Sequence, residues 1–253
     1  MVFAAFRNTH EGIRGWIAES KDDAVAAAAS PSDREKIDKA LTSIRTLLRL
    51  IDIHMEHEEK GLFPAVDNTF DKVAQKENFR TEHVHDLEEQ AQLKHIMDKI
   101  SHASKTTTVS PADVQELRDL VVAFGDNHIK HLEHEESILP PLTQKFMPEE
   151  SRPAIINHMI HLNFDTSFDF FPSAVVKQMT KRNPYASLRM FIAALQRVLT
   201  PEDYAKILPG MKEAAGDKWP ELEGHGLGGP GIFTEKDKMY LPSGLFDASV
   251  ASD

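Results

Sequence analysis

Histidines and glutamates recur with the same spacing at two places in the chain. HMEHEE begins at His54 and HLEHEE begins at His131. In each stretch a glutamate follows the first histidine by four residues, at Glu58 and at Glu135. Imidazole nitrogens and carboxylate oxygens are donors that bind iron, manganese and zinc. The repeated H-x-x-x-E spacing therefore predicts a metal site to which two separate segments contribute.

Helical geometry places each pair on the face that is expected to be buried. Residues four apart on a helix are separated by about 40° around its axis, so that His54 and Glu58 share a face. Leu47 and Ile51 lie on the same face, and the segment around His131 repeats the pattern. Burying an unpaired carboxylate costs several kcal/mol. A bound cation would remove this cost.

Two further histidines are expected to reach the same site from other helices. His10 shares a helical face with Phe6, Ile13 and Ile17. In the third long segment, either His83 or His85 could face inward, and wheel position favours His83. Six donors exceed the four that one tetrahedral zinc needs. They suit two metals bridged by the glutamates, with positions left for water or another small molecule. The predicted metal ligands are His10, His54, Glu58, His83, His131 and Glu135.

Other polar residues near the repeats are expected to have supporting roles. Glu59 and Glu136 turn away from the buried face and are interpreted as solvated residues or as partners of the ligands. His128 faces inward one turn before His131, which favours a core histidine over a residue that supports the metal.

Start and stop signals predict an all-α chain. Ser32 with Glu35 is typical of a capping box, Ser110-Pro111 of a helix start, and Pro140-Pro141 of a helix end. Four long amphipathic helices with modest connectors predict an antiparallel four-helix bundle. A helical extension with an irregular tail is expected to follow it. The expected helices are 3–20, 32–62, 76–102, 110–139, 149–165, 173–182, 185–199 and 201–215.

Composition excludes several classes of protein. The net charge of -11 argues against a nucleic acid or an anionic membrane as a partner, because either requires a basic surface. The chain has no cysteine, which excludes disulfides and thiolate metal sites. No signal peptide or membrane-spanning stretch is recognisable, and a cytoplasmic protein is expected.

HMEHEEKGLFP and HLEHEESILPPL resemble the motif of the haemerythrin-like, HHE cation-binding domain family. Glu82-His83 and His10 resemble histidine positions on its third and first helices. The resemblance implies a four-helix bundle, assigned to residues 1–147, that holds a non-haem di-iron centre, followed by an extension over 148–253. Two positions differ from the oxygen carriers: Leu87 stands where they have a second histidine on the third helix, and Glu136 stands where they have an aspartate.

The resemblance therefore implies a protein that handles iron, or that binds or reduces oxygen, peroxide or nitric oxide, more than a reversible oxygen carrier. Manganese and zinc suit the same donors. An alternative hypothesis is an iron- or oxygen-responsive interaction module that binds a partner protein through the extension. A zinc hydrolase is the weakest hypothesis, since no general base stands beside a three-ligand site.

Overall fold

The computed structural model describes residues 2–106, 108–146, 170–182 and 185–223, and the regular elements of these residues are all helical. The all-α prediction is confirmed for this part of the chain. No helix within these ranges is both long enough and apolar enough to cross a membrane. The helices are α1 (Val2–Ala28), α2 (Arg34–His57), a π-helix (Glu58–Leu62), α3 (Phe63–Thr69), α4 (Val73–Lys76), α5 (Phe79–Thr106), α6 (Pro111–Phe146), α9 (Phe170–Arg182), α10 (Tyr185–Val198), α11 (Pro201–Ala215), a 3-10 helix (Gly216–Lys218) and α12 (Trp219–Glu223).

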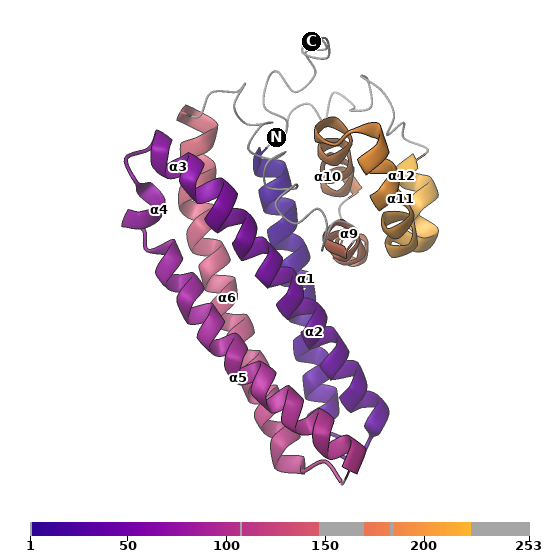
Figure 1. Ribbon diagram of the computed structural model, residues 1–253. Helices are drawn as coiled ribbons and strands as arrows, with labels where there is room; N and C mark the ends of the chain where they lie inside the picture. The colour runs from indigo at the N-terminus through magenta and orange to yellow at the C-terminus, as the bar shows by residue number, and fades with distance from the viewer. Residues whose placement is uncertain (1, 107, 147–169, 183–184, 224–253) are drawn as a thin grey trace.

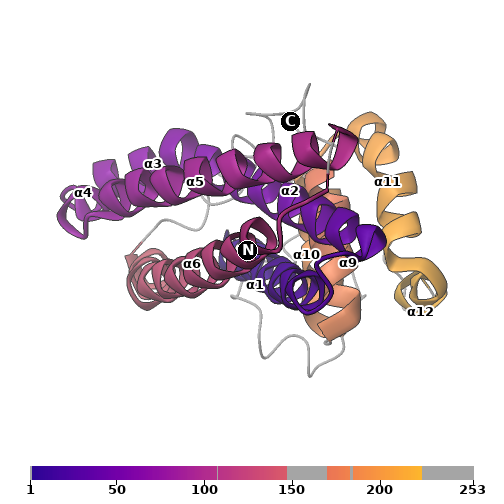
Figure 2. The ribbon, with the colours of Figure 1, turned by 90° about the horizontal axis from the view of Figure 1, so that it is seen from below.

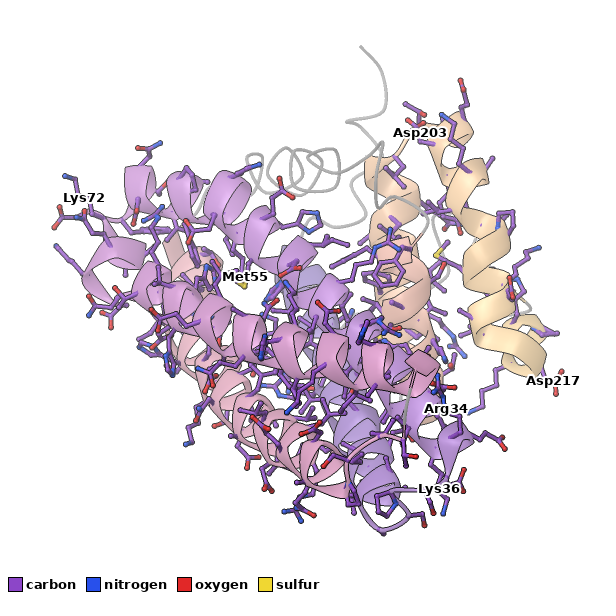
Figure 3. All side chains as sticks on the ribbon, turned by 60° about the horizontal axis from the view of Figure 1, so that its bottom comes forward. Arg34, Lys36, Met55, Lys72, Asp203 and Asp217 are labelled. Atoms are coloured by element: carbon purple, nitrogen blue, oxygen red, sulfur yellow. The ribbon has the colours of Figure 1, made fainter. Side chains whose placement is uncertain are left out.

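The four long helices lie in two layers. Helix α1 contacts α2 and α6, and α5 contacts α6 and α2. Figure 2 shows α2 and α5 in one layer and α1 and α6 in the other. Met55 is buried between the helices, and the side-chain amide of Gln90 donates to its sulfur, whereas Arg34 and Lys72 lie at the periphery (Figure 3). This arrangement turns the predicted ligand face of each long helix toward the other three.

Helices α9 to α12 pack beside α1 and α2 (Figure 1). Two glycines of α1 permit a close approach of α9. A Cβ added at Gly15 would lie 2.6 Å from Cβ of Gln178, and one added at Gly12 would lie 3.2 Å from Cα of Val175. The indole Nε1 of Trp16 donates to the carbonyl of Ala174 at 3.0 Å. Apolar residues of α9 to α12 belong to the same buried core as those of α1 and α2. The division at residue 147 stays a prediction.

The first helix is longer than the expected 3–20. The alanine-rich stretch that was expected to be a connector continues α1 to Ala28. Alanine has the highest intrinsic helix propensity. Ala24 and Ala27 are also fully buried, so the stretch gains from packing as well. The expected capping box at Ser32 is wrong, because α2 begins at Arg34 and the Asp33 carboxylate accepts hydrogen bonds from the amides of Glu35 and Lys36.

Prolines end fewer helices than the sequence predicts. Pro64 lies in the first turn of α3, which follows the π-helix without a break. Pro140 and Pro141 lie inside α6, which continues to Phe146. The ring fixes a helical φ, and burial of Leu139 and Thr143 offsets the lost backbone hydrogen bonds. The prediction that this proline pair ends the helix is wrong.

Other expected boundaries agree with the structure. Helix α6 begins at Pro111, and the Ser110 hydroxyl accepts from the Ala112 amide at 3.2 Å. The helices expected at 173–182, 185–199 and 201–215 correspond to α9, α10 and α11. The helix expected at 149–165 and the irregular tail beyond 223 lie outside the described residues.

Candidate metal centre

The six predicted ligands converge inside the bundle. His10 comes from α1, His54 from α2, Glu58 from the first residue of the π-helix, His83 from α5, and His131 and Glu135 from α6. Their exposed fractions lie between 0% and 5%.

Each glutamate directs one carboxylate oxygen toward each half of the site. Oε1 of Glu58 lies 3.2 Å from Nε2 of His54, and Oε2 lies 3.3 Å from Nε2 of His83. Glu135 is arranged in the same way, with Oε2 at 3.6 Å from Nε2 of His10 and Oε1 at 3.6 Å from Nε2 of His131. The residues form two groups, each with donor atoms within 4.8 Å of one another. The groups are His10, His54, Glu58, Glu135 and Glu58, His83, His131, Glu135.

Several of these buried donor atoms have no hydrogen-bond partner within the described ranges. They include both oxygens of Glu58, both oxygens of Glu135, and Nε2 of His83 and of His131. A buried polar atom without a partner costs roughly 1–3 kcal/mol. Since four histidine nitrogens and four carboxylate oxygens point into one small volume, the residues fit a bound cation.

The electrostatics of the two glutamates differ. Burial raises the pKa of Glu135 well above its usual value, and the negative charge of Glu58 raises it further. Burial alone would also raise the pKa of Glu58, but the imidazoles of His54, His10 and His83 hold it well below its usual value. Burial and the charge of Glu58 both favour the protonated form of Glu135, whereas a bound cation favours the ionised form.

A second layer of carboxylates orients the histidines. Nδ1 of His10 lies 2.9 Å from Glu136, and Nδ1 of His83 lies 2.9 Å from Glu59. Nδ1 of His131 lies 2.7 Å from Glu82. A carboxylate at Nδ1 holds the ring proton there and leaves the Nε2 lone pair for a metal. Glu59 and Glu136 were expected to be either solvated residues or partners of the ligands. Their distances to His83 and His10 agree with the second of these roles.

Cations hold two of these carboxylates in place. Arg14 donates two hydrogen bonds to Glu136, at 2.8 and 3.0 Å, and Arg80 donates to Glu59 at 3.0 Å. Burial alone would raise the pKa of Glu136, but His10 and Arg14 lower it to about 2. The carboxylate is therefore ionised across the whole range in which the protein is expected to work.

The choice between His83 and His85 is clear in the structure. His83 is 2% exposed, and its ring stacks on Phe63 with a centroid separation of 5.3 Å. The side chain of His85 is 60% exposed and lies near Glu88 and Glu89. The structure thus brings His83, and not His85, into the cluster.

The π-helix begins at a predicted ligand. Its wider turn starts at Glu58, and the amide of Phe63 donates to the Glu58 carbonyl. Such insertions occur often at functional sites, because they rotate the residues that follow relative to the preceding helix. The sequence did not indicate this irregularity.

Sequence reasoning singled out His128 but missed its partner beside the cluster, Asp86. Nδ1 of His128 lies 3.0 Å from Oδ2 of Asp86, and both residues are buried. Burial lowers the pKa of His128, although Asp86 acts in the opposite direction. Leu87, at the position of the oxygen carriers' additional histidine, is 49% exposed. Asp86 follows His83 by three residues, a spacing that places it on the inner face and could have drawn attention to it.

The match to known proteins comes from a family model. The model for the hemerythrin HHE cation binding domain matches residues 1–143. The chain belongs to this family, and the buried histidine and glutamate groups are its candidate cation site. Neither the curated proteins nor the solved structures contain a match to the chain.

Proposed function

We propose that the six residues hold two iron ions, one in each group, with Glu58 and Glu135 as bridges. The observation that carries this proposal is the orientation of the glutamates, since each offers one oxygen to each group. A single tetrahedral metal would leave several buried donors unused. Nitrogen and oxygen donors together suit iron, and also manganese or zinc. The four long helices then act as a hemerythrin-type bundle around the metals.

We infer further that the centre binds or reduces a small oxidant such as oxygen, peroxide or nitric oxide. Each group supplies four protein donors, so that a metal with a higher coordination number keeps an open position. Iron supplies the redox chemistry when it is bound. The protein buries the site, fixes the ring orientations through carboxylates and keeps bulk water away.

Metal content and optical spectra test this proposal. Purified full-length protein is expected to contain about two irons per chain, one for each group, and to show near-ultraviolet bands that change on addition of peroxide. His54→Ala and His131→Ala should each reduce the iron content, whereas His85→Ala, at an exposed position, should not. One zinc per chain, or no metal with an unaltered fold, would refute the di-iron assignment.

A second candidate function is a metal-responsive module whose extension contacts a partner protein. The close packing of α9 on α1 favours it, because α1 also carries His10. If metal loading is transmitted along α1, hydrogen exchange in α9 should slow when iron is added. Equal exchange with and without iron would remove the support for this function.

A further inference from the structure

His128 places an additional acceptor atom beside the metal cluster. It lies on α6 one turn before His131 and is 0% exposed. The two rings have a centroid separation of 5.4 Å, and the other side of His128 stacks on Phe124 at 5.7 Å. Packing between two rings fixes its plane.

The two nitrogens of His128 have different surroundings. Nδ1 lies 3.0 Å from the Asp86 carboxylate, which accepts its proton in a hydrogen bond. Nε2 is buried and has no hydrogen-bond partner in the part of the chain that the structure describes. When the Asp86 carboxylate holds the ring proton at Nδ1, the imidazole has a lone pair at Nε2. The same carboxylate arrangement holds His10, His83 and His131.

Position distinguishes His128 from the six candidate ligands. Neither group of donor atoms within 4.8 Å of one another includes it. Its ring packs against that of His131, a member of one group, but its nitrogens lie more than 4.8 Å from at least one donor atom of each group. An acceptor in that place is suited to a proton carried by a molecule that occupies the centre. The hydrogen bond would give the buried nitrogen the partner that it lacks.

We propose that His128, held by Asp86, is a positioning residue that accepts a hydrogen bond from a protonated ligand in the metal centre. The ligand class that this favours is hydrogen peroxide and similar proton-bearing oxidants, in preference to ligands without a proton such as nitric oxide or azide. This inference rests on the proposed function, since it assumes that a small ligand enters the centre.

Two probes separate the effect on proton-bearing ligands from a general effect on the site. Azide binding to the iron-loaded, full-length protein is followed by its charge-transfer absorption. Stopped-flow displacement of azide then gives the apparent affinity for hydrogen peroxide. The variants are His128→Leu, which removes the acceptor, and His128→Gln, whose side-chain oxygen restores one. His85→Ala is the matched control, because His85 is an exposed histidine on α5. Iron content and thermal unfolding are measured for every variant.

The expected result is a selective loss. His128→Leu should weaken peroxide about tenfold and change azide affinity by less than about twofold, the effect of one net hydrogen bond. His128→Gln should recover most of the peroxide affinity, and His85→Ala should behave as the unaltered protein.

Three results would overturn the inference: equal changes for both probes, no change for either, or loss of iron from the His128→Leu protein. A His128→Gln protein as weak as His128→Leu would also count against the acceptor role. If the unaltered protein holds two irons but binds neither probe, the proposed oxidant function is refuted at the same time. If it binds both probes and His128→Leu changes neither, only the role of His128 is refuted.

Discussion

Replacing Glu135 by leucine should change stability in opposite directions with and without metal. Glu135 is fully buried, and both of its oxygens have no hydrogen-bond partner within the described residues. The nearby Glu58 carboxylate raises its pKa further. In the metal-free protein this carboxyl group is a cost, and a leucine of similar volume removes it. In the metal-loaded protein the same change would remove one of the two proposed bridging donors.

The magnitudes follow from burial and from ligand linkage. An unpartnered buried polar group costs about 1–3 kcal/mol. For a chain of this length each kcal/mol corresponds to roughly 2–4 °C, so the Tm of metal-free Glu135→Leu should rise by roughly 2–12 °C. Metal at 1,000 times its Kd stabilises a protein by about 4 kcal/mol. Loss of that binding removes about 4 kcal/mol, whereas the gain of about 2 kcal/mol from removing the carboxyl group remains, so the Tm of the variant in the presence of iron should fall by roughly 4–8 °C relative to the unaltered protein.

Thermal unfolding followed by circular dichroism measures both effects. Protein prepared with a chelator is compared with protein reconstituted with iron, for the unaltered chain and for Glu135→Leu. Glu133→Leu is the matched control, because Glu133 is exposed on the same helix. If Glu135→Leu lowers the Tm in both preparations, Glu135 supports the fold directly, and the argument that its carboxylate is kept for a cation is wrong.

Three other predictions concern residues around the centre. Glu136→Gln should weaken metal affinity about 10- to 100-fold, because the His10 ring would be held less firmly. Competition with a chelator measures the affinity, and a Glu→Gln change at an exposed position of α6 is the control. Gly15→Ala should destabilise the protein by about 1–3 kcal/mol in urea unfolding, since the new Cβ would lie 2.6 Å from Gln178, whereas an unhindered helical glycine would gain stability from the same change. Burial alone would raise the pKa of Glu19, but its hydrogen-bond partners on α9 lower it. Its contribution to the free energy of unfolding, at most about 1 kcal/mol, is therefore present above pH 4.5 and is lost as the pH falls further. Glu19→Gln should remove that part of the pH dependence of stability.

The sequence was most informative where helical periodicity and residue chemistry coincide. The four-residue spacing from His54 to Glu58 and from His131 to Glu135 places each pair on one face, and the structure brings all four together. The preference for His83 over His85 depended on the same reasoning and agrees with the burial of the two residues. Periodicity works here because tertiary packing selects the apolar face of each helix.

Features that depend on contacts between helices could not be predicted in this way. The pairing of His128 with Asp86 joins α6 to α5, and the spacing within each helix shows that both residues face inward but not that they meet. The π-helix changes the angular position of the residues that follow Glu58. A prediction from regular periodicity assumes that each residue turns the helix by the same angle. Pro140 and Pro141 carry a local stop signal that burial of the neighbouring residues overrides.

The packing of α9 on α1 also has a consequence for the order of folding. During synthesis α1 leaves the ribosome before α9, and its glycine-lined face meets α9 only after residues 29–169 and α9 itself have been made. Contacts between segments so distant in the chain slow folding, because a long loop must close before they form. Until then the Trp16 face of α1 is exposed to water and to other chains. This face is therefore where a chaperone that binds the nascent protein should be found, and crosslinking from position 16 on stalled ribosomes would detect it.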